Sequence, residues 1–122
     1  MQEKIIQMNA YFAAKIAACE QRRQELQKDS RADEAAFEKI KSNVYEIFRT
    51  VLSAAVTAGQ GNEGTVRDFF LKKTEQIPAN WRTAYEKAVQ HDDAKTMQIE
   101  HVKLDTLAEI QNAFQEIWGC AV

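Results

Sequence analysis

The sequence has very little of the residues that break helices. Its 122 residues include four glycines and one proline. Ala, Glu, Gln and Lys, which lose little conformational freedom in a helix, are abundant. Three of the four glycines fall in one segment, residues 59–64. The sequence therefore predicts an all-α protein without a β-sheet.

Long apolar runs and a cysteine framework are also missing. No run approaches the roughly 18 apolar residues of a membrane span, and the opening MQEKIIQMNAYF does not resemble a signal peptide. The two cysteines, Cys19 and Cys120, suit neither a disulfide framework nor a metal-binding pair with short spacing. We expect a cytoplasmic protein without a membrane segment. Cys19 is predicted to be a buried free thiol, and Cys120 lies in a terminal tail that could form an adventitious disulfide.

Neither sign of charge is in large excess. Sixteen basic and 18 acidic residues give a net charge of −2, which argues against a protein whose main task is to coat nucleic acid or an anionic membrane. A length of 122 residues fits one domain with one core. We expect a single helical-bundle domain over residues 1–122.

The strongest helical pattern covers residues 37–58. One row of apolar residues comprises Phe37, Ile40, Val44, Ile47 and Val51, and the row beside it comprises Tyr45, Phe48, Leu52, Ala55 and Val56. The two rows cover about half the circumference, more than a one-sided surface helix needs. This segment is therefore predicted to be a central helix with neighbours on two flanks.

The apolar spacing predicts an antiparallel bundle of three long helices, at about residues 2–28, 31–58 and 93–118. A short helical pair, about 65–77 and 79–91, is inserted before the last one, with Pro78 separating its two members. We expect this pair to reverse direction within itself. One alternative stays open, because no strong breaker lies between Lys28 and Arg31: the first two helices would then be one continuous helix in an elongated dimer.

Residues at the predicted boundaries are of the types that begin and end helices. Capping residues precede three of the helices: Ser30 with Asp33, Thr65 with Asp68, and the adjacent Asp92 and Asp93. Gly59 is placed to follow the end of the second helix, and Gly119 is placed to stop the last one.

We find no assembled catalytic constellation, so we expect no enzyme, no cofactor and no metal. The best candidate for a metal or acid–base site is a polar cluster: His91, Asp92, Asp93, Glu100, His101 and Asp105. His101 and Asp105 are neighbours on one helix surface. However, a di-iron bundle needs a Glu-x-x-His on each of two helices, and Gln98 takes the place of that Glu. A solvated surface is the favoured interpretation.

The first functional interpretation is a structural or adaptor module that acts through protein contacts, either with another protein or with a second copy in a homodimer. Ile6, Leu71 and Val102 fall off the main apolar stripes and are candidates for a partner-facing patch. Another interpretation, which we rank third, is a metal- or small-ligand-binding helical protein with an aromatic pocket between its helices. A packed core is favoured over such a pocket.

The second interpretation is a nucleic-acid-binding regulator that uses the locally basic segment 65–91. Its candidate contacts are Arg67, Lys72, Lys73, Arg82 and Lys87. Two short helices around a break resemble a helix-turn-helix in architecture. Trp81, Tyr85 and Val89 are predicted to pack rather than to read bases, and the local charge excess is small, so this is the weaker hypothesis.

Overall fold

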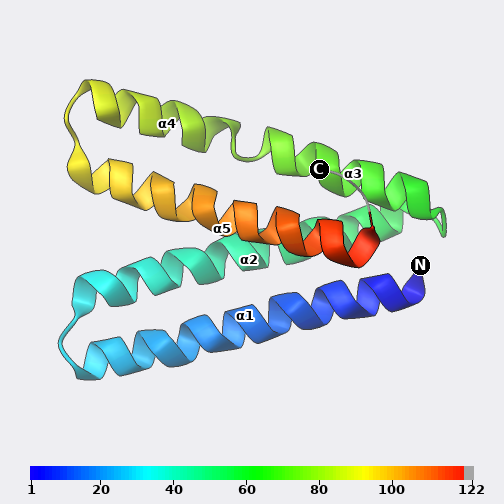
Figure 1. Cartoon of the computed structure of the whole chain (residues 1–122), viewed down its shortest axis with the longest axis horizontal. Coiled ribbons are helices and arrows are strands. Elements are labelled where there is room, and N and C mark those ends of the chain that lie inside the picture. The colour runs from blue at the N-terminus through cyan, green and yellow to red at the C-terminus, as the bar shows by residue number, and fades with distance from the viewer. Residues whose placement is uncertain (120–122) are drawn as a thin grey trace.

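A computed structural model describes residues 1–119, which form five α-helices and contain no strand (Figure 1). The helices are α1 (Gln2–Lys28), α2 (Ala32–Gly59), α3 (Glu63–Gln76), α4 (Ala79–Gln90) and α5 (Ala94–Trp118). The predicted all-α bundle is confirmed, and Cys120 lies outside the described residues. Within residues 1–119, none of the helices has both the length and the apolar character that crossing a bilayer requires.

The first two helices form an antiparallel hairpin, so the alternative of one continuous helix is wrong. The chain turns between Asp29 and Arg31, where Ser30 adopts a left-handed backbone conformation with φ of 60°. After the turn, α1 and α2 pack against each other. α2 also packs against α3 and α5, which is the central position that its broad apolar surface predicts.

The helical pair α3 and α4 does not reverse direction, contrary to the expectation from the sequence. The two helices follow one another along the same edge of the molecule (Figure 1). Ile77 and Pro78 both keep right-handed φ and ψ angles, −62° and −45° for Ile77 and −77° and −1° for Pro78. Proline lacks a backbone N–H, so it interrupts the helical hydrogen bonds here without turning the chain. The bundle therefore has four rods, and the third is broken at Pro78.

Because α3 and α4 make one rod, the chain crosses the molecule four times in alternating directions (Figure 1). The helices α2 and α5 consequently run parallel, with their first turns at the same end. We call this the open end, and it also holds the α1–α2 and α4–α5 turns. The opposite, closed end holds the α2–α3 loop, the start of α1 and the end of α5. There Lys4 Nζ donates to the Trp118 carbonyl oxygen at 3.3 Å and lies 2.6 Å from Glu63 Oε1.

Large buried side chains are concentrated toward the closed end. The ring of Phe70 on α3 stacks on Phe114 of α5 at a centroid distance of 4.3 Å, and Phe114 stacks on Trp118 at 4.8 Å. Phe48 of α2 meets Phe70 edge-on at 6.2 Å. Toward the open end the buried apolar residues are fewer and mostly smaller: Leu26, Ala35 and Ala88. The core therefore binds the rods tightly at one end only.

Side-chain capping explains where two of the helices begin. The Asp93 carboxylate accepts a hydrogen bond from Thr96 N at 3.1 Å, which confirms Asp93 as the cap of α5. The predicted cap at Thr65 is wrong, because Asn62 Oδ1 accepts from Thr65 N at 3.0 Å and α3 begins two residues earlier. An Asn at the cap position holds the first turn, so the residues between it and Thr65 become helical.

The remaining helix ends depend on backbone conformation. α2 begins without a side-chain cap after Arg31, so the predicted cap at Ser30 is wrong. Asp92 does not cap α5 but lies in the turn, with φ of 54°. Gly59 is the last residue of α2 rather than the residue after it, and Gln60 adopts the left-handed conformation. Gly119 has φ of 73° and ends α5, as predicted.

Gly59 of α2 lies directly against Val66 of α3, and we predict that Gly59→Ala destabilises the protein. A Cβ at this position would overlap Val66 Cγ2, and the Val66 side chain is fully buried. The expected cost is about 1–3 kcal/mol of unfolding free energy, even though alanine is the better helix former. Urea denaturation of both proteins measures it. In a Val66→Ala background the same substitution is expected to cost less, and an equal cost in both backgrounds would contradict this contact.

Candidate functional site

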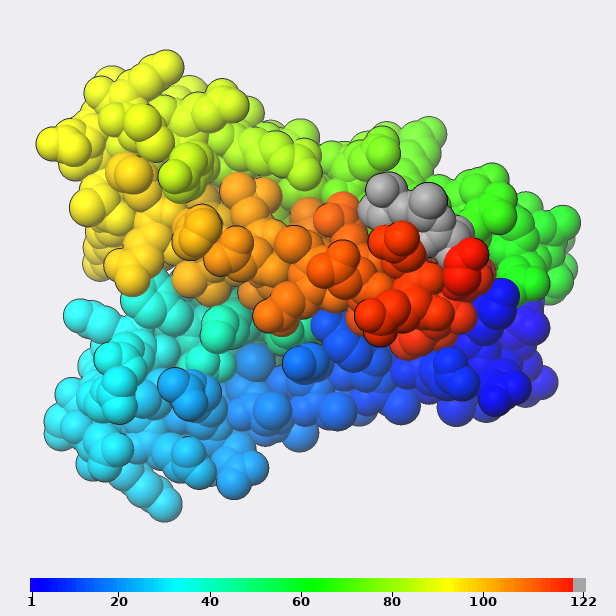
Figure 2. All heavy atoms as spheres, viewed as in Figure 1, coloured from blue at the N-terminus to red at the C-terminus, as the bar shows by residue number. Residues whose placement is uncertain are grey.

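A cleft of about 660 Å³ lies between α2 and α5 at the open end. Figure 2 shows the surface hollowed at this end, between the cyan tip of the α1–α2 hairpin and the yellow tip formed by α4 and α5. The lining residues come from the first turns of the two parallel helices: Asp33, Glu34, Ala36, Phe37 and Ile40 of α2, and Ala94, Lys95, Gln98 and Ile99 of α5.

Apolar side chains in this cleft are only partly covered. Phe37, Ile40 and Ile99 are half-buried, whereas the rings of the aromatic contacts toward the closed end, Phe48, Phe70 and Phe114, are fully buried. A concave surface that leaves apolar side chains in contact with water gains free energy when another molecule covers it. The cleft is therefore the strongest candidate for a binding site.

The rim of the cleft carries opposite charges on its two walls. Asp33 is exposed on the α2 wall, and Lys95 is exposed on the α5 wall. Within residues 1–119 neither side chain takes part in an ion pair, whereas Glu34 on the α2 wall pairs with Arg31. The rim thus presents one acidic and one basic group that are free to interact with a bound molecule.

The cleft stays open because α4 does not fill it. α4 packs on α5 and makes few contacts with α2. Its first turns reach α2 through Trp81, whose ring meets Phe48 edge-on at 6.5 Å. Farther along, the buried residue of α4 is Ala88, and Val89 is 50% exposed. Beyond Trp81, α4 contributes no side chain to the lining of the cleft, which comes from α2 and α5.

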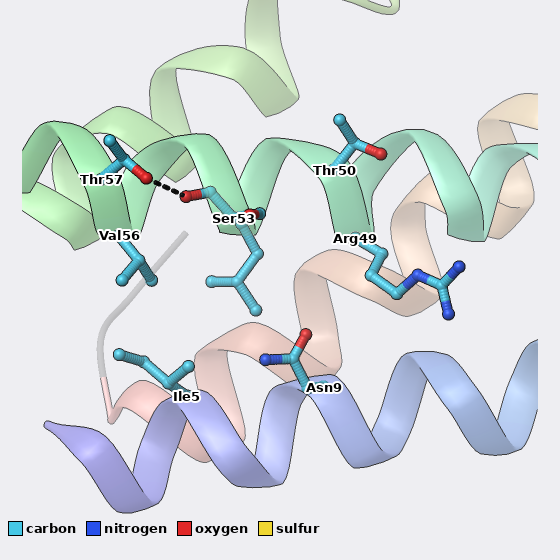
Figure 3. A pocket seen from close by; sticks show the side chains of 8 residues that line it. Ile5, Asn9, Arg49, Thr50, Ser53, Val56 and Thr57 are labelled. Atoms are coloured by element: carbon cyan, nitrogen blue, oxygen red, sulfur yellow. Dashed lines mark hydrogen bonds between the residues drawn. The ribbon is translucent and has the colours of Figure 1, made fainter.

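A second groove of about 480 Å³ lies between α1 and α2 near the closed end. Figure 3 shows its lining: Ile5 and Asn9 of α1, and Arg49, Thr50, Leu52, Ser53, Val56 and Thr57 of α2. Two of its hydroxyls are already used within α2, since Thr50 donates to the Glu46 carbonyl at 3.0 Å and Thr57 to the Ser53 carbonyl at 3.2 Å. The charged side chain of the lining, Arg49, is exposed and so cannot fix a small ligand as a buried group would.

A polar seam joins α1, α2 and α5 in the middle of the bundle. The Tyr45 hydroxyl donates to Glu109 Oε2 at 2.8 Å, and the Tyr11 ring meets the Tyr45 ring edge-on at 6.1 Å. Burial, and to a lesser extent the Glu109 charge, raises the pKa of Tyr11 to about 12. Burial and the hydrogen bond to Glu109 raise the pKa of Tyr45 as well. Both phenols stay protonated at neutral pH, so the seam holds helices together rather than transferring protons.

Cys19 is a buried free thiol, as predicted. It lies beside Glu38 of α2, a buried carboxylate that pairs with Arg22 at 3.1 Å and with Lys41 at 3.2 Å. Burial in the first place, and then the Glu38 charge, raises the pKa of the Cys19 thiol to about 11. A thiol with such a pKa is protonated at neutral pH, which makes it a poor nucleophile and a poor metal ligand.

The polar cluster considered as a metal site is dispersed in the structure. Three of its members are exposed in or beside the α4–α5 turn: His91, Asp92 and Asp93. His101 Nε2 and Asp105 Oδ2 lie 3.0 Å apart on the exposed face of α5, while Glu100 is buried and bonded to Lys103 Nζ at 3.1 Å. In the part of the chain that the structure describes, no group of three or more His, Cys, Asp or Glu side chains is placed to hold a metal ion.

The basic residues of the nucleic-acid hypothesis do not gather on one face. They are Arg67, Lys72 and Lys73 on α3, and Arg82 and Lys87 on α4. Helical geometry places the three on α3 roughly 100–140° apart, and the two on α4 roughly 140° apart. Arg67 pairs with Asp68 at 3.1 Å, and Lys73 Nζ lies 5.7 Å from the centre of the Phe69 ring. The two helices also continue along one rod rather than crossing as in a helix-turn-helix.

The three candidates for a partner-facing patch lie on three different helices. Ile6 on α1 is 62% exposed. Leu71 on α3 is half-buried and packs against the core, and Val102 on α5 is half-buried. Their role in binding a partner stays a prediction, and Ile6 is the most accessible of the three.

Reasoning from sequence missed the cleft. It assigned Phe37, Ile40 and Ile99 to packed helix faces, because their spacing matches a core stripe. The available signal was the pair of small residues Ala84 and Ala88 on the packing face of the helix that became α4. The cleft can be inferred from these two alanines only when the position of α4 along α5 is known.

Similarity to known proteins adds no indication of function. Comparison with models of protein families, with curated proteins and with solved structures finds no match for this chain. The geometry of the cleft and the chemistry of its lining are therefore the basis for a functional proposal.

We predict that Cys19 resists thiol reagents in the folded protein. A Cys120→Ser variant isolates Cys19, and its reaction with a disulfide reagent at pH 8 can be followed by absorbance. Because the folded thiol has a raised pKa and is buried, labelling is expected to be slow in buffer and fast in denaturant. A labelling rate that denaturant does not change would show that Cys19 is accessible.

We also predict that stability falls between about pH 10 and pH 12 in part through Tyr11. Its pKa is about 12 in the folded protein and near 10 when unfolded, so the stabilising contribution is complete below pH 10 and is lost as pH rises toward 12. Urea denaturation at several pH values is expected to show a smaller loss for Tyr11→Phe than for wild type. Lysine titration is common to both proteins. An identical loss would mean that Tyr11 titrates normally.

Proposed function

We propose that the protein is a helical module that acts through contacts with proteins, as a structural or adaptor component, and that the open-end cleft is its binding site. The observation that carries this proposal is the partial exposure of Phe37, Ile40 and Ile99 inside a concave surface. Apolar centres surrounded by a polar rim are a common feature of protein interfaces.

The dimensions of the cleft favour insertion of a few anchoring side chains over docking of a flat surface. Its volume, about 660 Å³, is within the range of roughly 300–1,000 Å³ that ordinary binding pockets occupy. An amphipathic helix or a hairpin tip presents apolar anchors at suitable spacing. The charged groups of the rim, Asp33 and Lys95, then fix the orientation of the bound segment.

The proposal is tested with the double variant Ile40→Asp/Ile99→Asp. Both side chains are half-buried at the cleft, so the added carboxylates remain close to water, and circular dichroism is expected to show an intact helical fold. Proteins captured from cells that naturally make this chain are quantified by mass spectrometry. A protein that binds the cleft is expected to be retained on the order of tenfold less by the variant than by wild type, as for an interface anchor.

Val89→Asp is the matched control, because Val89 is 50% exposed at the same end but does not line the cleft. It is expected to retain the same proteins as wild type. If the double variant retained every protein as well as wild type does, including a second copy of the chain, the cleft would not be the binding site.

A further inference from the structure

We infer that the partner of the open-end cleft is a second copy of this chain, with the first turn of α2 from each copy seated in the cleft of the other. This inference rests on the proposed function and names its partner. It depends on the distribution of charge and apolar surface around the cleft, which is complementary to itself.

The charges of the rim are arranged as a two-fold dimer requires. In such a dimer, a residue that contacts a second residue across the interface is matched by the same contact in reverse. Asp33 lies on the α2 wall and Lys95 on the α5 wall, and neither forms an ion pair within residues 1–119. When α2 of one copy lies beside α5 of the other, Asp33 of each copy faces Lys95 of its partner. The Asp33–Lys95 pair then occurs twice, and each of the four charges has one partner of opposite sign.

The parallel course of α2 and α5 makes this arrangement geometrically natural. Both helices begin at the open end, so a two-fold axis parallel to them, outside the mouth of the cleft, places the α2 wall of one copy against the α5 wall of the other with their first turns level. The paired helices then run parallel, as α2 and α5 do within one copy. The half-buried side chains of Phe37, Ile40 and Ile99 from both copies then meet around the axis and leave water.

The charged pairs contribute mainly to specificity, because they determine which surfaces meet. They contribute less to the affinity of the dimer. Exposed ion pairs contribute little because water and salt screen them. Like charges that face each other across an interface are strongly unfavourable, however, so reversal of one charge is a sensitive probe of the contact.

Sedimentation equilibrium of the reduced full-length chain tests the inference. Wild type is expected to form a reversible dimer at concentrations up to about 200 µM, which covers weak interfaces of micromolar affinity. Asp33→Lys alone and Lys95→Glu alone are each expected to weaken the dimer at least about tenfold, because both put like charges at the two contacts. An equimolar mixture of these two variants is expected to restore the dimer.

Restoration in the mixture reports contacts between copies only. Within each variant chain the two walls of the cleft still carry like charges, whereas between the variants every contact pairs a lysine with an acidic residue. Lys95→Glu adds a carboxylate to the first turn of α5, where the helix dipole favours it, so this variant is expected to fold. If Asp33→Lys did not fold, Asp33→Asn would replace it, and its mixture with Lys95→Glu would recover the dimer partly because one attractive contact remains.

Three results would overturn the inference: a wild-type monomer throughout the concentration range, a dimer that neither charge reversal weakens, or a mixture that stays monomeric. A wild-type monomer that still captures another protein through Ile40 and Ile99 would remove the second copy as partner and leave the proposed function standing. Loss of both the dimer and all cleft-dependent capture would remove both.

Discussion

The stacking of Phe70 on Phe114 fixes α5 against α3, Trp118 extends the stack within α5, and the edge-on contact of Phe48 with Phe70 brings in α2. Planar rings in contact allow few alternative arrangements, so the relative position of these three helices is set near the closed end. The polar seam through Tyr45 and Glu109 then aligns α2 and α5 farther along. Beyond the seam no comparable contact joins them, and the space between their first turns remains as the cleft.

Much of this fold could be predicted because apolar periodicity reports directly on burial. The two rows of residues 37–58 identified the central helix, and the helix ends were placed within a few residues. The direction of α4 could not be predicted in the same way. A proline biases the preceding residue away from helical geometry but does not forbid it, and Ile77 keeps ψ of −45°. That one backbone angle decides whether the chain turns back or continues.

The candidate site was harder to predict than the fold because exposure is a property of the assembled bundle. Phe37 and Ile40 have the same spacing as Val44, which is 2% exposed, and nothing local distinguishes them. Their difference arises from what lies opposite: Val44 is covered by other rods, whereas Phe37 and Ile40 face the open cleft between α2 and α5. By contrast, the buried state of Cys19 and the capping role of Asp93 depend on local pattern and were predicted correctly.

The limited contact of α4 with α2 has a consequence for the motions of the molecule. Segments with few buried apolar contacts open at a lower free energy than the rest of a protein and exchange their amide hydrogens faster. α4 is such a segment, since it packs chiefly on α5, while the aromatic stack holds the opposite half. The bundle thus has a rigid half and a compliant half. A molecule that enters the cleft must order the compliant half, and the entropy lost in this ordering lowers its affinity. In return, the cleft can adapt to molecules of different shapes.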